Sequence, residues 1–161
     1  MPLLLAAVAG VLVLAALAAL ARTVFSVIVV SGPSMSPALR PGRRVLVVRR
    51  GLARLRTGRI VVVVSDEDGR PTASPVGAGP RRLLIKRLAA LPGEPVPDQV
   101  RDAVPGPAVP GGRLILLGDN PGLSTDSRVW GAVPVAGVVG VVLEGVRLRD
   151  APLGPGRPVG R

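Results

Sequence analysis

The chain of 161 residues has no histidine and no cysteine, and its 21 basic residues include a single lysine, Lys86. Without histidine there is no Ser-His-Asp triad and most zinc sites are excluded. Without cysteine there is neither a disulfide framework nor a thiolate nucleophile. We therefore predict no metal and no cofactor, and any hydrolytic site in this chain must use a base other than histidine.

Aromatic residues are almost absent as well, since Phe25 and Trp130 are the only two. Single-stranded nucleic acid is usually bound by stacking bases on aromatic side chains, and this chain has no such platform. The net charge of +11 would suit nucleic acid or an acidic lipid surface. The arginines are scattered along the whole chain, however, in a composition rich in Ala, Gly, Pro and Val that is typical of a high-GC genome. We predict no nucleic-acid partner.

The amino-terminal segment is a long uncharged run. Residues 3–21 consist of Leu, Ala, Val and Gly, close to the ~20 residues that cross a hydrocarbon core. A cleaved signal peptide would carry a positive n-region, which is missing here, although Ala19-Leu20-Ala21 resembles a cleavage site and keeps that alternative open. We predict a retained single-span anchor over residues 1–22, with the lipid bilayer as partner. Charge bias does not decide its orientation.

The remainder of the chain predicts a mostly β domain over residues 23–146. Short β-branched runs bounded by Gly, Pro and charge indicate strands at residues 24–30, 45–48, 60–64 and 114–117, with one or two more within 133–143. Residues 65–80 and 92–112 are predicted loops, and residues 118–128 a polar turn region. The Pro/Gly/Arg-rich tail, residues 147–161, is predicted to be disordered.

Two residues stand out as candidates for chemistry. Ser34 lies in a turn restrained by Gly32, Pro33 and Pro37, which can hold a hydroxyl in one direction, although such serines are usually only turn residues. If residues 82–88 are extended, Lys86 shares one face with two leucines and points toward an apolar interior. Burial there would disfavour the ammonium and lower the pKa of the amine, as a lysine general base requires.

Three motifs occur in order along the domain. They are Gly-x-Ser-Met-x-Pro at residues 32–37, Ile-Lys-Arg-x-x-x-Leu-Pro-Gly-Glu at residues 85–94, and Gly-Asp-Asn-x-x-x-Ser-x-Asp-Ser-Arg-x-Trp-Gly at residues 118–131. The ordered set resembles the type I signal peptidase family. That resemblance implies a membrane-anchored serine endopeptidase with a Ser/Lys dyad and a compact antiparallel, barrel-like β fold.

The resemblance also implies roles for individual residues. Ser34 matches the nucleophile and Lys86 the base that takes its proton. Ser124 matches the serine that orients the lysine amine, and Asp126 and Arg128 match an ion pair that shapes the site. The backbone N–H of the nucleophile would be one oxyanion donor. Further support of the site is expected from the neighbouring pair Asp119 and Asn120.

The chain departs from the family pattern at a few positions. Gly32 stands where some members have a serine that donates a second hydrogen bond to the oxyanion, and whether Ser31 compensates is open. Arg43 and Arg59 stand where the family usually has aspartate, at expected turns. The segment before residue 113 is short, so the accessory cap of larger members is missing.

Several functions remain open at this stage. The leading hypothesis is a monomeric signal peptidase in the cytoplasmic membrane. Its catalytic domain would lie on the extracytoplasmic face and cut extended preproteins after small residues. A dedicated maturation protease of one client protein would have the same motifs. A self-cleaving repressor-type protease should carry a DNA-binding domain instead of the apolar run. A non-enzymatic basic membrane protein would not depend on Ser34 and Lys86.

Overall fold

The amino-terminal segment of the computed structural model is a helix, α1, spanning Pro2–Val24. The model describes residues 1–49, 55–73, 82–146, 148 and 150. Within α1, residues Ala7–Val24 have a mean hydropathy of 2.2 and none of this stretch is buried against the protein, so the helix is long and apolar enough to cross a membrane. It extends two residues beyond the predicted anchor, and Val24, which was predicted to begin a strand, is its last residue.

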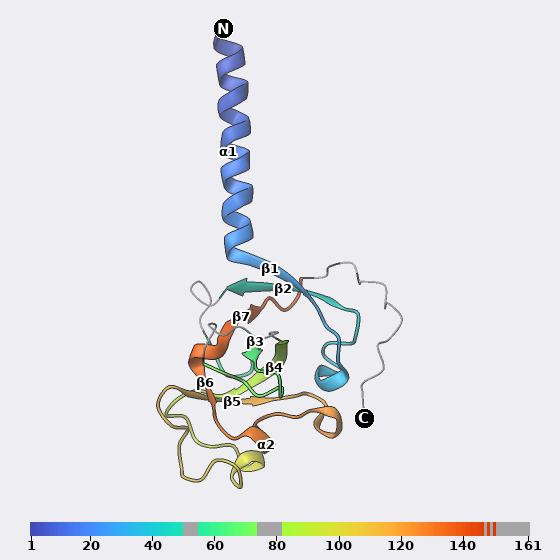
Figure 1. Ribbon diagram of the computed structural model, residues 1–161, viewed down its shortest axis with the longest axis vertical. Coiled ribbons are helices and arrows are strands. Elements are labelled where there is room, and N and C mark those ends of the chain that lie inside the picture. Colours follow the sequence, from blue (N-terminus) through green and yellow to red (C-terminus); the bar gives the residue numbers. More distant parts are fainter. Residues whose placement is uncertain (50–54, 74–81, 147, 149, 151–161) are drawn as a thin grey trace.

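The rest of the described chain forms one seven-stranded sheet in the order β1-β2-β7-β3-β4-β5-β6, with every neighbouring pair antiparallel (Figure 1). The strands are β1 (Phe25–Val29), β2 (Arg44–Arg49), β3 (Ile60–Ser65), β4 (Arg82–Ala90), β5 (Arg113–Leu117), β6 (Val133–Pro134) and β7 (Val138–Val142). The predicted mostly β class is confirmed. The sheet is not closed by hydrogen bonds, however, because β1 and β6 are its free edges, so barrel-like describes it only loosely.

The predicted strands all form, with shifts of one or two residues at their ends. Ser65, predicted to begin a loop, is the last residue of β3, and the predicted run 133–143 divides into β6 and β7. β7 does not close the edge of the sheet but inserts between β2 and β3. Residues 74–80 of the predicted loop 65–80, and all of the predicted tail 147–161 except residues 148 and 150, lie outside the described residues.

The core lies on both sides of the central strand β3, which is buried along its whole length. Because successive side chains of a strand point to opposite faces, Val62 packs in one apolar cluster with Met35 and Val45. Val61 and Val63 pack in a second cluster, which includes Leu88 of β4. The strand is continuously β-branched because both of its faces are covered.

Residues 92–112, predicted to have little regular structure, are more ordered than expected. They contain a 3₁₀ turn, η2 (Asp98–Val100), and an isolated bridge between Pro95 and Ala108. Four of their valines form a third cluster with Ala90 and Ile115: Val96, Val100, Val104 and Val109. The composition is rich in Pro and Gly because the segment turns often, and the regularly placed valines hold it against β4 and β5.

α1 joins the sheet with no intervening loop, since β1 begins at Phe25 directly after the helix. In Figure 1, β1 and β2 lie at the end of the domain next to α1, and the short helix α2 (Ser127–Trp130) lies at the opposite end. The free edge strand is thus a direct continuation of the apolar helix.

Candidate active site

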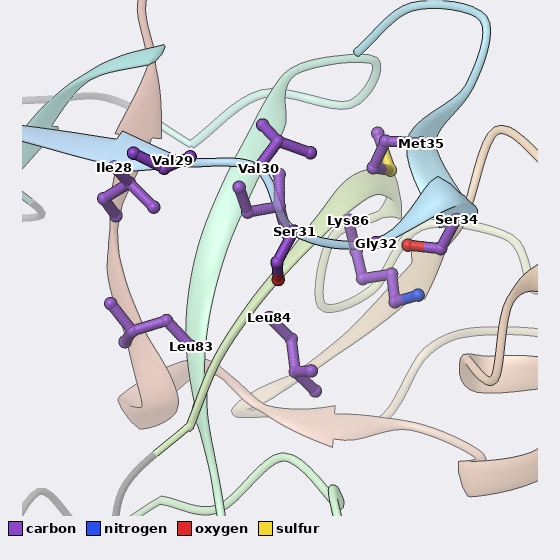
Figure 2. Close-up of a pocket in the computed structure, with 11 residues that line it drawn as sticks. Ile28, Val29, Val30, Ser31, Gly32, Ser34, Met35, Leu83, Leu84 and Lys86 are labelled. Atoms are coloured by element: carbon purple, nitrogen blue, oxygen red, sulfur yellow. The ribbon is translucent and has the colours of Figure 1, made fainter. Parts of the chain in front are cut away.

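A pocket of about 130 Å³ lies between the end of β1 and the first half of β4. It brings together the first two motifs of the sequence, 52 residues apart, with Ser34 and Lys86 at the same end (Figure 2). Its walls are apolar apart from the hydroxyls of Ser31 and Ser34 and the Lys86 amine. They comprise Ile28, Val29, Val30, Ser31, Gly32, Ser34, Met35, Leu83, Leu84, Ile85 and Lys86.

Ser34 is held by a short 3₁₀ turn, η1 (Pro33–Met35), that follows the edge strand. The Ser36 N–H donates to the carbonyl of Pro33 at 3.0 Å and closes the turn. Met35 inserts into the core with only 1 % of its surface exposed. The carbonyl of Ser34 itself accepts from the Asn120 N–H at 3.0 Å, so the third motif holds the turn of the first.

Lys86 lies in the middle of β4, opposite Val61 of β3, and is 4 % exposed. The predicted alternation is correct, because Leu84 and Leu88 pack in one apolar cluster and Ile85 in the other. The amine donates a hydrogen bond to Ser124 Oγ at 2.8 Å. Lys86 therefore contacts the serine that was predicted to orient it, and not Ser34 directly.

The hydrogen bonds continue from Ser124 into an ion pair between the buried Asp126 and the partly exposed Arg128. Ser124 Oγ donates to Asp126 Oδ2 at 2.8 Å, and the Gly118 N–H donates to the same oxygen at 2.8 Å. The Arg128 guanidinium donates to both carboxylate oxygens, through Nε at 3.0 Å on Oδ1. Asp126 is completely buried. Its charge is thus fully compensated, as a buried carboxylate requires.

Burial and the charges of Asp126 and Arg128 shift the pKa values in the site. Burial lowers the pKa of Lys86 below its ordinary value; the nearby Asp126 carboxylate opposes the shift and the Arg128 guanidinium adds to it. Burial alone would raise the pKa of Asp126, but the hydrogen bonds from Gly118, Arg128 and Ser124 outweigh it and lower that pKa. Relative to the same groups in water, both shifts favour the uncharged amine of Lys86 and the ionised carboxylate of Asp126.

Gly118 has a steric role that sequence reasoning missed. A Cβ atom at this position would lie 2.1 Å from Ser124 Oγ and 2.7 Å from the Ser34 carbonyl oxygen. Only glycine allows the end of β5, the turn of Ser34 and the side chain of Ser124 to meet. The motif contains this glycine, but the close approach depends on three segments that only the fold brings together.

Asp119 and Asn120, predicted to support the site, lie on two sides of it. Asp119 forms a two-point ion pair with Arg87, with Nε–Oδ1 and Nη2–Oδ2 distances both 2.7 Å. Asn120 holds the turn that carries Ser34, through its N–H and through its side-chain amide, whose Nδ2 lies 3.4 Å from the Pro33 carbonyl oxygen.

Two further residues of the third motif received no role from the sequence. Ser127 is fully buried and accepts from the Leu116 N–H at 2.9 Å, which fastens α2 to β5. The ring of Trp130 lies over the Lys86 amine, with its centroid 5.7 Å from Nζ. The spacing of a lone tryptophan from a lone lysine gives no signal of this contact, because the two are 44 residues apart.

The oxyanion region has room for another group. Gly32 has extended backbone, φ −113° and ψ 160°, and a Cβ there would meet no atom within 4 Å. The glycine is therefore not required by the fold. In Figure 2 the Ser31 hydroxyl points toward the side of Leu84, away from Ser34. Among the described residues, no three His, Cys, Asp or Glu side chains gather where they could hold a metal ion.

Comparison with known proteins identifies the family of the chain. Residues 4–99 and 97–144 match the family described as signal peptidase, peptidase S26. The chain is also similar to the mitochondrial ATP-independent inner membrane protease subunit 1a of Arabidopsis thaliana. The identity is 31 % over 129 residues, which cover 76 % of this chain and 70 % of that protein. The protein belongs to the signal peptidase family, a family of membrane-associated peptidases that act on peptide substrates.

Proposed function

We propose that this protein is a single-pass membrane serine endopeptidase that removes amino-terminal signal peptides from exported preproteins with a Ser34/Lys86 dyad. The observation that carries the proposal is the burial of the chain's only lysine, hydrogen-bonded to Ser124, at the end of the pocket that also contains Ser34. A desolvated amine with a lowered pKa is uncharged, and so able to accept a proton, at lower pH than a lysine in water.

The proposed reaction begins when Ser34 Oγ attacks the scissile carbonyl carbon and its proton passes to Lys86 Nζ. The carbonyl oxygen becomes an oxyanion, which accepts from the Ser34 N–H. Collapse of this intermediate breaks the C–N bond, and the Lys86 ammonium returns the proton to the leaving amine. A water molecule, deprotonated by Lys86, then attacks the acyl carbon; the ester bond to Ser34 breaks, and the Lys86 ammonium returns the proton to Ser34 Oγ. Catalytic hydrogen bonds often tighten only when substrate binds, which accommodates an amine that contacts Ser124 in the free enzyme.

The sheet offers places for an extended substrate on both sides of the pocket. Among the described residues, β1 pairs only with β2, which leaves its other edge free. β4 pairs with β5 only from Arg87 onward, so no described strand pairs with the first half of β4 on that side. A preprotein segment would add to these edges by main-chain hydrogen bonds, and the small apolar pocket would accept small residues before the cleaved bond.

The proposed location is the cytoplasmic membrane, with α1 as the anchor and the catalytic domain on the extracytoplasmic face. The exposed, apolar α1 supports the anchor. Protease added to intact spheroplasts should remove the catalytic domain. Full protection behind an intact membrane would contradict the proposed face, without bearing on the catalytic mechanism.

The test of function is cleavage of a panel of secretory preproteins by the purified protein in detergent. We expect cleavage after small residues, and complete loss of it in Ser34→Ala and Lys86→Ala, with circular dichroism spectra like that of the wild type. Wild-type turnover by either folded variant would rule out the assignment of Ser34 and Lys86 as a catalytic dyad. Cleavage of one client alone would instead identify a dedicated maturation protease, which the similarity to an inner membrane protease subunit keeps as the second candidate.

A further inference from the structure

The indole ring of Trp130 is the feature of the site that the proposed mechanism does not yet use. The ring lies over Lys86 Nζ with a centroid distance of 5.7 Å, inside the ~6 Å range in which an aromatic face attracts a cation. Lys86 is 4 % exposed, so the ring and the amine interact with little water to screen them. Tryptophan is the strongest aromatic partner for a cation.

The position of Trp130 is fixed by the same residues that hold Ser124. The carbonyl of Asp126 accepts from the Trp130 N–H at 2.9 Å, while the carboxylate of Asp126 accepts from Ser124 Oγ. Ser127 ties α2 to β5, and Gly131, with φ +74°, ends the helix where a Cβ would lie 2.9 Å from the Ala103 carbonyl. The ring also packs against the apolar cluster that contains Leu88.

We propose that Trp130 is a positioning residue for the Lys86 amine, and that the face of its indole ring stabilises the ammonium that exists while Lys86 carries the proton of Ser34. This inference rests on the proposed dyad. Ser124 Oγ accepts from the amine, and the two charged groups that act on it among the described residues are Asp126 and Arg128. Arg87, its neighbour on β4, is turned to Asp119. The Asp126 carboxylate attracts the ammonium and the Arg128 guanidinium opposes it, so the ring adds to an attraction that Arg128 weakens.

The chain allows a direct test, because Lys86 is its only lysine and Trp130 its only tryptophan, and it has no tyrosine. Protein labelled with ¹³C,¹⁵N-lysine gives one side-chain Cε–Nζ signal, which can be titrated in detergent from about pH 6 to 11. We expect the midpoint to fall by roughly 0.3–0.7 pH unit in Trp130→Leu, which keeps an apolar cover but removes the π face, and by less in Trp130→Phe. Val129→Ala, at the 64 % exposed neighbouring position, is the matched control and should leave the midpoint unchanged.

An unchanged or higher midpoint in Trp130→Leu would overturn the proposal. A fluorescence titration covers the case in which that variant does not fold. Emission from Trp130 should change over the same pH range as the lysine signal, and Lys86→Met should abolish the change; the same change in Lys86→Met would also count against the contact. Activity provides the third readout, since loss of the ring should lower kcat, leave KM unchanged and move the acid limb of the pH profile with the lysine midpoint.

These outcomes are separable from failure of the proposed function. The lysine and fluorescence titrations need no turnover and report only on the Trp130–Lys86 contact. Retained cleavage in Ser34→Ala would remove the dyad while leaving that contact intact.

Discussion

Lys86 and Arg87 are neighbours on β4, yet their surroundings on the two faces of the strand are opposite. Lys86 is buried, and its amine contacts a neutral hydroxyl, which separates it from the nearest carboxylate. Arg87 is partly exposed and makes a two-point ion pair with Asp119. Burial lowers the pKa of the lysine, whereas the hydrogen bonds that Arg87 donates to the Asp119 carboxylate raise the pKa of the arginine.

The difference shows how one strand can carry two cations with different tasks. A group that must exchange a proton needs desolvation and an acceptor that does not fix its charge. A group that joins two segments needs a permanent charge and a carboxylate of matching shape. The same loop serves both, because Gly118 donates to Asp126 on the Lys86 side while the next residue, Asp119, pairs with Arg87.

The largest effect on activity is expected when Lys86 is replaced by arginine, the residue type at the neighbouring position 87. Lys86→Arg should be inactive at every pH from about 6 to 10, because a guanidinium keeps its proton in proteins. The wild type should gain activity as the pH rises through the lowered pKa of Lys86, since only the neutral amine accepts a proton. Cleavage of a synthetic peptide with Ala at the first and third positions before the cleaved bond measures the activity of the variant and the pH profile of the wild type. An active variant with an unchanged profile would end the Ser/Lys mechanism.

The next largest effect on activity is expected from adding a methyl group at Gly118, in the loop that contacts both faces of β4. Gly118→Ala places a Cβ against Ser124 and the turn of Ser34, so one or both must move. A misplacement of about 1 Å can cost ~10²-fold in rate, and we expect at least that loss in kcat. Gly111→Ala is the matched control, because its Cβ would meet nothing within 4 Å and the residue does not line the pocket. Equal losses in the two variants would show that the close approach at Gly118 is unimportant.

Removing the hydroxyl that separates Lys86 from Asp126 should have a smaller effect. Ser124→Ala leaves the amine without its acceptor and should lower kcat by about 10²-fold, within the ~10²–10⁴-fold range of general base catalysis, with KM nearly unchanged. Steady-state kinetics on the same peptide separates the two parameters. Turnover at the wild-type rate would mean that Ser124 does not orient the base.

The smallest effect is expected on the other face of β4. Arg87→Lys cannot reproduce the two-point pairing with Asp119 and should lower the free energy of unfolding by about 1 kcal/mol, as for other partly exposed ion pairs. Cleavage should stay within a few-fold of the wild type. Urea unfolding and peptide cleavage together test this prediction. Loss of activity as complete as in Lys86→Arg would show that the two faces are not independent.

The sequence was sufficient for the local part of this architecture. β-branched runs predict the strands because a strand buried on both faces must be apolar throughout, as in β3. Period-two alternation predicts that Lys86 points into the interior, and the ordered motifs indicate the residues that meet it. These inferences use information that lies within a few residues along the chain.

The remaining features depend on contacts between residues that are far apart in the sequence, and a local sequence pattern does not predict such contacts. The insertion of β7 between β2 and β3 is a long-range pairing, and nothing in residues 133–143 distinguishes an edge strand from a central one. The close approach at Gly118 involves three separate segments, and the contact of Trp130 with Lys86 joins two. The valines of residues 92–112 were overlooked because prolines and glycines dominate that segment, although the valines form its core.

The direct junction of α1 with β1 limits the distance between the apolar helix and Ser34. Ser34 comes ten residues (34 − 24) after the last residue of the helix. A fully extended chain spans at most ~3.3–3.6 Å per residue, so with α1 in a bilayer the Ser34 hydroxyl stays within about 36 Å of the end of the anchor. Under the proposed function, a peptide bond would then be selected by its height above the membrane as well as by its side chains. A preprotein held in the same membrane would meet the site at a high effective concentration, so a small pocket would suffice where binding from solution would be too weak.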